Sequence, residues 1–252
     1  AAYHKQQAKS DIMPLSMCVA MSQGYIGYHM QQGLEKVLRA RKNGKRVVTV
    51  VTQVVVDKDD PKFKAPSKPI GPFYTEDEAR KLEAEKGYTM KEDAGRGWRR
   101  VVASPMPVEI VELDAVKCLM NGGFIAITVG GGGIPVIKDE NGNYIGTAAV
   151  IDKDLASERL AEDIDADALV ILTAVEQVCI NFGKPEQKSL ATMTVEEARR
   201  YMAEGHFAPG SMLPKVEAAV KFVESKPGRK AIITSLDKAV EALEGKAGTT
   251  VC

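Results

Sequence analysis

Four short apolar runs, rich in β-branched residues, recur along the chain between segments of helical character. They span residues 46–56, 124–129, 168–173 and 230–234. Short, bounded runs of this kind are typical of strands that are buried on both faces. Strands that alternate with helices indicate an α/β fold with a mainly parallel sheet and right-handed crossovers. We therefore expect a three-layer α/β/α sandwich.

Start and stop signals predict where the intervening helices lie. Thr194 with Glu197 forms a capping box, and Ser211 is a natural N-cap residue ahead of Pro214 in a first turn. The predicted helices span 14–42, 108–120, 155–164, 194–204, 211–223 and 235–243. The first residues, before this series, resemble the tail of an earlier helix. The small residues of 14–42 favour a tightly packed helix or a subunit contact.

Residues 57–107 differ from the rest of the chain because six prolines divide them into short segments. Thr75 with Glu78 predicts a small capped helix there. We expect an inserted subdomain within a single domain that spans 1–252. The Arg-rich cluster around Trp98 could stack on nucleic acid, but a fold-stabilising Trp with salt-bridged arginines fits a neutral chain better.

Composition excludes several classes of function. The 252 residues carry 34 basic and 34 acidic side chains, so nucleic acid or an anionic membrane is not an expected partner. Four separated cysteines (Cys18, Cys118, Cys179, Cys252) and three histidines argue against a zinc site and suggest reduced thiols. We find neither a signal peptide nor an apolar run that could cross a bilayer. A cytoplasmic location is the simplest expectation.

A run of four glycines, Gly130–Gly133, directly follows the second apolar run. Glycine packs nothing and costs conformational entropy, so core filling does not explain the run. Its backbone N–H groups could approach an anion closely, although a flexible turn is the alternative. Further on, Asn141-Gly142 predicts a β-hairpin.

Lysines at two predicted helix starts suggest phosphate handling. Lys153 lies between Asp152 and Asp154, and Lys215 lies in the first turn of the helix that follows Ser211. A cation near a helix N-terminus is unfavourable unless an anion neutralises it. The structural alternative for Lys153 is an ordinary ion pair with a neighbouring aspartate.

The end of the 168–173 run is a second candidate position for a ligand. In an open parallel sheet, ligands bind beyond the carboxyl ends of the strands. Thr173 and Val175 occupy that position, and a loop containing Phe182 follows.

Several stretches, in order along nearly the whole chain, resemble the carbamate kinases of the amino acid kinase fold family. Shared features include Lys68-Pro69-Ile70-Gly71-Pro72 and Val150-Ile151-Asp152-Lys153-Asp154. The other similar stretches are 13–15 with 20–24, 51–57, 91–99, 130–135 and 205–215. Several of these motifs are particular to this kinase within its superfamily.

This resemblance implies reversible, Mg²⁺-dependent phosphoryl transfer between ATP and carbamate, giving ADP and carbamoyl phosphate. Lys153 and Lys215 would flank the phosphoryl group, while Asp152 and Asp154 orient them and help to hold the Mg²⁺–nucleotide. Lys68 would close over the phosphate from the insertion. Gly130, Gly131, Gly132 and Gly133 would line the carbamate side, and the nucleotide would lie near Thr173, Val175, Val178, Phe182, Ser211 and Met212.

The resemblance also implies an oligomeric state and a physiological direction of the reaction, and the chain departs from the family in one respect. A homodimer is expected, with helix 14–40 as a candidate contact, and the reaction commonly runs toward ATP in fermentative arginine breakdown. Mg²⁺ is expected on the nucleotide phosphates without a direct protein ligand. Two glycine-rich loops that open the family's sequences have no counterpart in these 252 residues. A truncated, non-catalytic polypeptide therefore remains an alternative. Another acylphosphate-forming kinase of the same fold is a second alternative, although the inserted segment 57–107 argues against it.

Overall fold

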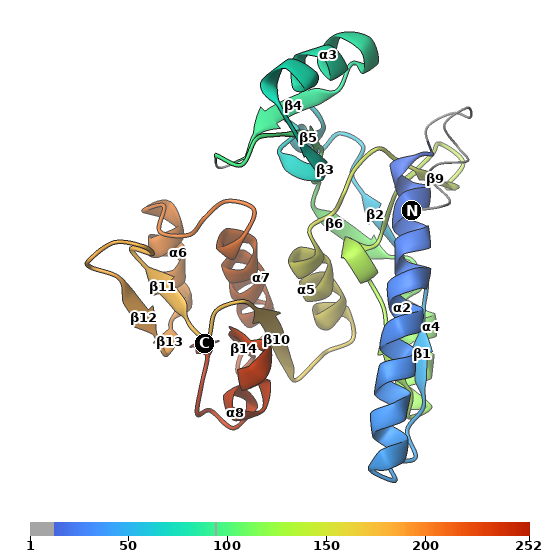
Figure 1. The fold of residues 1–252 in the computed structure, drawn as a ribbon. Coiled ribbons are helices and arrows are strands. Elements are labelled where there is room, and N and C mark those ends of the chain that lie inside the picture. The colour runs from blue at the N-terminus through green and yellow to red at the C-terminus, as the bar shows by residue number, and fades with distance from the viewer. Residues whose placement is uncertain (1–12, 94) are drawn as a thin grey trace. The chain divides into compact units, whose positions relative to one another are not determined.

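The computed structural model describes residues 13–93 and 95–252 and comprises two compact units. The units are Ala1–Ile151, whose described residues are coloured blue to green-yellow, and Asp152–Cys252, coloured yellow to red (Figure 1). The predicted tail of an earlier helix, before residue 13, lies outside the described residues. None of the described helices combines the length and apolar character that crossing a bilayer requires.

Two sheets form the framework of the first unit. In one, β1 (Val47–Thr49) pairs in parallel with β7 (Ile125–Ile127). In the other, the order is β6-β2-β8-β9, and the central pair β2–β8 is parallel. Its strands are Pro107–Ile110 (β6), Gln53–Val56 (β2), Ile134–Lys138 (β8) and Tyr144–Gly146 (β9). The predicted hairpin at Asn141-Gly142 is confirmed by the antiparallel β8–β9 pair.

The prediction of one continuous strand over 46–56 is wrong, because the chain leaves the ladder between β1 and β2. Val51 is 48% exposed there, whereas Thr52 is fully buried. The side chain of Gln23 accepts a hydrogen bond from the Thr52 N–H (2.7 Å) and donates one to the Thr52 C=O (3.1 Å). A distant glutamine therefore takes up backbone groups that a straight strand would give to a neighbouring strand.

The predicted helix 108–120 is also wrong over its first residues. Val108–Ile110 belongs to strand β6, and helix α4 begins only at Leu113 and ends at Asn121. Val108 is exposed and Ile110 is buried, which is the period-two alternation of a half-buried strand. The first helix, α2, spans Leu15–Ala40, and only two of its residues, Gln23 and Gly27, are buried. It is therefore not tightly packed against the described residues of this chain.

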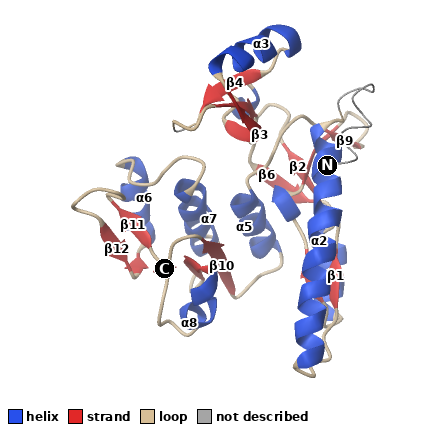
Figure 2. Ribbon diagram, viewed as in Figure 1, coloured by secondary structure: helices blue, strands red, loops and turns tan. Residues whose placement is uncertain are grey.

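The insertion contains its own antiparallel sheet, in the order β3-β5-β4, with helix α3 beside it (Figure 2). Its elements are Pro61–Phe63 (η1), Lys68–Tyr74 (β3), Glu76–Lys86 (α3), Thr89–Glu92 (β4) and Trp98–Val102 (β5). The predicted capping box at Thr75 is confirmed. The Arg80 guanidinium lies 4.4 Å from the centre of the Trp98 ring, and Arg96 and Arg99 pair with Asp93. The predicted salt bridges of these arginines are therefore confirmed.

The second unit has a four-stranded sheet in the order β10-β14-β15-β13, in which β10 (Ala168–Thr173) and β14 (Lys230–Ser235) pair in parallel over six residues. Both strands, and the capped helix α6 (Val195–Ala203), are confirmed predictions. The helix predicted over 235–243 is instead a 3₁₀ turn followed by a short α-helix. The remaining elements are Lys153–Asp163 (α5), Val178–Ile180 (β11), Lys188–Leu190 (β12), Thr192–Met193 (β13), Met212–Glu224 (α7), Leu236–Lys238 (η3), Ala239–Leu243 (α8) and Thr249–Val251 (β15).

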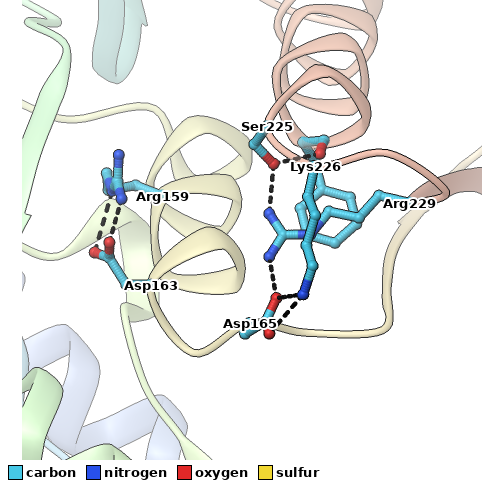
Figure 3. Close-up of polar contacts among 7 residues, drawn as sticks. Arg159, Asp163, Asp165, Ser225, Lys226 and Arg229 are labelled. Carbon is cyan, nitrogen blue, oxygen red and sulfur yellow. Dashed lines mark hydrogen bonds and ion pairs between the residues drawn. The ribbon is translucent and has the colours of Figure 1, made fainter.

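Helices α5 and α7 pack together, and both contact β10. Polar side chains connect the C-terminal ends of the two helices to each other (Figure 3). Asp165, just after α5, accepts hydrogen bonds from Lys226 (2.8 Å) and Arg229 (2.7 Å), just after α7. Arg229 also lies 4.8 Å from the centre of the Phe222 ring. The two C-termini are thus held side by side, and the two helices run in the same direction.

Candidate active site

The topology of the second unit brings both helix N-termini to one end of the sheet. Only four residues, 164–167, separate the end of α5 from the start of β10, so α5 runs antiparallel to that strand. The short link from α7 to β14 has the same effect. The N-termini of α5 and α7 therefore lie at the carboxyl ends of β10 and β14, where open α/β sheets bind ligands.

A buried ion pair joins these two N-termini. Lys215 Nζ donates to Asp154 Oδ2 over 2.7 Å, and the two residues are only 8% and 7% exposed. Asp154 is the second residue of α5 and Lys215 is the fourth of α7. A carboxylate is favoured at a helix N-terminus, whereas a cation is not. The anion that the sequence required beside Lys215 is therefore Asp154, which lies 61 residues away.

Asp152 and Lys153 complete the start of α5. Asp152 is the N-cap residue, and its Oδ1 accepts a hydrogen bond from the Asp154 N–H (2.9 Å). Lys153 Nζ lies 3.7 Å from Asp154 Oδ2, and its side chain is 63% exposed. One carboxylate oxygen thus faces two lysines, of which Lys215 is buried and fixed and Lys153 can extend into solvent.

Four of the residues predicted for the nucleotide also lie at this end of the unit. Thr173 ends β10 and pairs in register with Ser235 at the end of β14, and Val175 follows in the next loop. Ser211 and Met212 begin α7. Ser211 is the N-cap residue of α7, as predicted, but its side chain makes no capping hydrogen bond within the described part of the chain.

The other two predicted nucleotide residues are placed differently. Val178 has no exposed surface, and its N–H donates to Thr249 Oγ1 (2.8 Å), so its side chain belongs to the core. Phe182 is 68% exposed, on the loop between the hairpin strands β11 and β12. Sequence reasoning missed this hairpin, because each of its strands has only three residues and carries too short a pattern.

In the first unit, the glycine run forms a tight 3₁₀ turn, Gly130–Gly132 (η2). The N–H groups of Gly132 and Gly133 donate to Val129 and Gly130 within the turn. A Cβ on Gly133 would lie 2.1 Å from Val54 Cγ2. The turn therefore packs closely against Val54 at Gly133. At Gly131 it is open, because a Cβ there would meet no atom within 4 Å.

A small hollow of about 140 Å³ adjoins the glycine turn. Gln23, Thr128, Gly130 and Gly131 contribute to its lining, together with apolar residues of α2 and β7 and with Val50, which follows β1. Gln23 donates to the Gly130 C=O (2.9 Å). Sequence reasoning did not assign Gln23 to the site, because no local pattern marks a contact across 107 residues.

The remaining predicted residue, Lys68, begins β3 of the insertion and is half-buried. Among residues 13–93 and 95–252, no group of three or more His, Cys, Asp or Glu side chains is arranged to hold a metal ion. All four cysteines are free thiols.

Comparison with known proteins gives consistent matches over nearly the whole chain. The sequence model of the amino acid kinase family matches residues 63–235. The carbamate kinase-like protein YqeA of Escherichia coli is 58% identical over 249 residues, which are 98% of this chain and 79% of that protein. The carbamate kinase of Clostridium perfringens is 56% identical over 248 residues, with the same coverage of both chains.

A solved structure agrees with these relatives. The carbamate kinase from Giardia lamblia bound to AMP-PNP superposes with a TM-score of 0.88 at 46% identity. The match covers 98% of this chain and 78% of that one. The resemblance seen in the sequence motifs therefore extends to the three-dimensional fold.

Proposed function

Because the chain belongs to the carbamate kinases of the amino acid kinase family, we propose that it transfers a phosphoryl group reversibly between ATP and carbamate. The products are ADP and carbamoyl phosphate. The observation that carries this proposal is the buried ion pair between Lys215 and Asp154 at two adjacent helix N-termini. We propose a cytoplasmic enzyme that runs toward ATP in arginine breakdown.

The chemistry requires fixed positive charge rather than a covalent nucleophile. Negative charge spreads over the oxygens of the transferring phosphoryl group, and preorganised cations and N–H donors stabilise it. Burial and the bond to Asp154 hold Lys215 in one position before substrate arrives. The helix N-terminus adds a positive dipole end that favours an anion. Lys215 is therefore proposed as the fixed cation of the transition state.

Lys153 is proposed as the second, more mobile cation. Its side chain is 63% exposed and only loosely paired with Asp154, so it can turn toward a phosphate at little cost. Asp152 holds the first turn of α5 through its bond to the Asp154 N–H. We further propose that Gly130–Gly133 binds the carbamate side and that Lys68 approaches the phosphate when the insertion moves.

The nucleotide is proposed to lie at the carboxyl ends of β10 and β14. The AMP-PNP complex of the Giardia lamblia relative supports a nucleotide site in this fold. The predicted contacts are Thr173, Val175, Val178, Phe182, Ser211 and Met212. Val178 would need the core around it to open before its side chain could touch a ligand.

Mg²⁺ is proposed to arrive on the nucleotide phosphates, where it would neutralise charge. The site's carboxylates fit this role only indirectly, since Asp154 is bonded to Lys215 and Asp152 accepts from a backbone N–H. These residues would therefore orient the lysines around the metal–nucleotide rather than replace its phosphate ligands.

We also propose a homodimer that uses helix α2. Large apolar side chains of this helix are exposed in the single chain, which is typical of an interaction surface. They include Met17, Met21, Tyr25, Ile26, Tyr28 and Met30. Sedimentation at micromolar concentration tests this proposal, and a monomer at all concentrations would contradict it.

The activity test is a coupled assay for ATP formation from ADP and carbamoyl phosphate with Mg²⁺. We expect Lys215→Ala to lower turnover by about 10²-fold or more, with nucleotide affinity changed only a few-fold. Lys230→Ala is the matched control, because this exposed lysine begins β14 at the opposite end of the unit. Turnover that Lys215→Ala leaves unchanged would remove Lys215 from the mechanism. A folded wild-type chain without turnover would refute the proposed activity.

A further inference from the structure

Gln23 is an unusual buried residue on an otherwise exposed helix. It is 4% exposed, whereas most side chains of α2 face outward. Burying an amide without partners costs about 1–3 kcal/mol, so a buried glutamine must be satisfied by hydrogen bonds. Here both ends of the amide are paired, and every partner is a backbone group outside the helix. The role of the Gln23 side chain is therefore to bind the backbone of Thr52 and Gly130 rather than to fill the core.

The three hydrogen bonds join two separate segments. Nε2 donates to the C=O of Thr52 (3.1 Å) and to the C=O of Gly130 (2.9 Å), while Oε1 accepts from the Thr52 N–H (2.7 Å). The same C=O of Thr52 accepts from the N–H of Ile134 (2.8 Å). Gln23 thus fixes the glycine turn directly at Gly130 and, through Thr52, just beyond Gly133.

The side chain of Thr52 extends this network to the start of the turn. Its Oγ1 accepts from the N–H of Val129 (3.1 Å) and lies 2.7 Å from Thr128 Oγ1. Thr52 is fully buried. The two residues together therefore hold the backbone on both sides of the four glycines.

The glycine turn needs such support because its backbone is strained. Val129 has φ +46°, a left-handed conformation, which costs a residue with a Cβ about 1–2 kcal/mol. Gly131, Gly132 and Gly133 also have positive φ. A run of this kind keeps one conformation only when its surroundings determine it. The open side of the turn is at Gly131, which is exposed.

We propose that Gln23 is a positioning residue for the small acid substrate, which it influences by holding the glycine turn in its binding conformation. This inference rests on the proposed function, in which the turn binds the carbamate side of the reaction. Gln23 touches no substrate in this scheme. Its loss is expected to weaken use of carbamoyl phosphate and to leave ADP binding unchanged, because the nucleotide site lies in the other unit.

The test compares Gln23→Glu with Gln32→Glu. The first keeps the shape and the acceptor for Thr52 but removes both N–H donors when ionised. The second makes the same chemical change at an exposed position of α2. We expect Gln23→Glu to raise KM for carbamoyl phosphate at least tenfold and KM for ADP less than twofold. We expect this rise to shrink at low pH, where the introduced carboxyl group is protonated and regains one donor.

A second measurement does not depend on activity. Amide hydrogen exchange over residues 129–134 should accelerate at least tenfold in Gln23→Glu and stay unchanged in Gln32→Glu. If Gln23→Glu does not fold, Gln23→Met replaces it, since it removes the amide and keeps a side chain of similar length, with Gln32→Met as its control. Unchanged exchange in the turn would overturn the positioning role even in an active enzyme. Accelerated exchange in an enzyme whose two KM values stay the same, or rise equally, would overturn the link to substrate. Accelerated exchange in Gln23→Glu, when the wild-type chain shows no turnover, would refute only the proposed activity.

Discussion

Glu158 provides a sharp prediction, because it is a carboxyl group buried within helix α5. It is 1% exposed, and its Oε1 has no hydrogen-bond partner among the described residues. Burial, together with the hydrogen bond and charge of Glu162, raises the pKa of Glu158 to about 8, although Lys221 and Arg159 oppose the shift. At neutral pH the side chain is therefore protonated.

The sign of the effect on stability follows from proton binding. The unfolded chain releases this proton near pH 4.5 and the folded chain only near pH 8. Between these values the folded state binds more protons, so the free energy of unfolding decreases as pH rises. The difference corresponds to a ceiling of about 5 kcal/mol at about 1.36 kcal/mol per pH unit. Water penetration and relaxation reduce it, and we expect about 2–3 kcal/mol.

The assay is the pH dependence of stability in the wild type and in Glu158→Gln. We expect the two proteins to be similar at about pH 5 and the variant to be more stable by about 2–3 kcal/mol at about pH 9. Trp98 lies in the first unit, so a probe within α5 itself is required. Amide exchange over residues 153–164 is the appropriate probe. Glu196→Gln, at an exposed position of α6, is the matched control.

Two results would refute this reasoning. If the wild type and Glu158→Gln lost stability in parallel over this pH range, Glu158 would not be the titrating group. If Glu158→Gln were less stable at every pH, the carboxyl group would hold a contact that the amide cannot make. Glu162→Gln then separates the two acids, since it removes the neighbouring charge and leaves Glu158 buried.

Three further perturbations test other parts of the structure. Gly133→Ala should destabilise the first unit by about 3 kcal/mol or more, because its Cβ would lie 2.1 Å from Val54. Gly131→Ala should cost only about 1 kcal/mol, because the space beside Gly131 is open. Equal urea midpoints of the two variants would contradict this difference. Asp165→Asn should lower the urea midpoint of the second unit, because two basic side chains lose their carboxylate, and an unchanged midpoint would show that the cluster is not stabilising. Lys68→Ala should impair turnover of carbamoyl phosphate while ADP still binds. If the ADP affinity measured by calorimetry fell as much as turnover, the result would contradict a lid role.

The sequence predicted the elements whose signals are local. The strand 168–173 and the capped helix that begins after Thr194 are confirmed, since a bounded apolar run and a capping box each lie within a few residues. The break in the predicted strand 46–56 could not be predicted in this way. It depends on Gln23, which is 29 residues from Thr52 and resembles any other polar residue of its helix.

The error at 108–110 has a different cause, because the signal was present in the sequence. Pro107-Val108-Glu109-Ile110 alternates with period two, and Pro107 suits the start of an edge strand. The helical interpretation extended the pattern of Leu113–Asn121 too far toward the N-terminus. Element boundaries fail in this way when two periodicities meet without a turn residue between them.

The candidate site shows how far residue types alone can lead. Lys153, Lys215 and the two aspartates were identified individually, but their pairing depends on the parallel packing of α5 and α7. Asp165 fastens the C-terminal ends of these helices, and Asp154 with Lys215 joins their N-terminal ends. Glu158 lies one helical turn beyond Asp154 on the same face of α5. An ionised Glu158 would place a second negative charge near the only carboxylate bonded to Lys215 in the described residues. The pH dependence expected for Glu158 therefore concerns the stability of α5, the helix whose first turn holds Asp154.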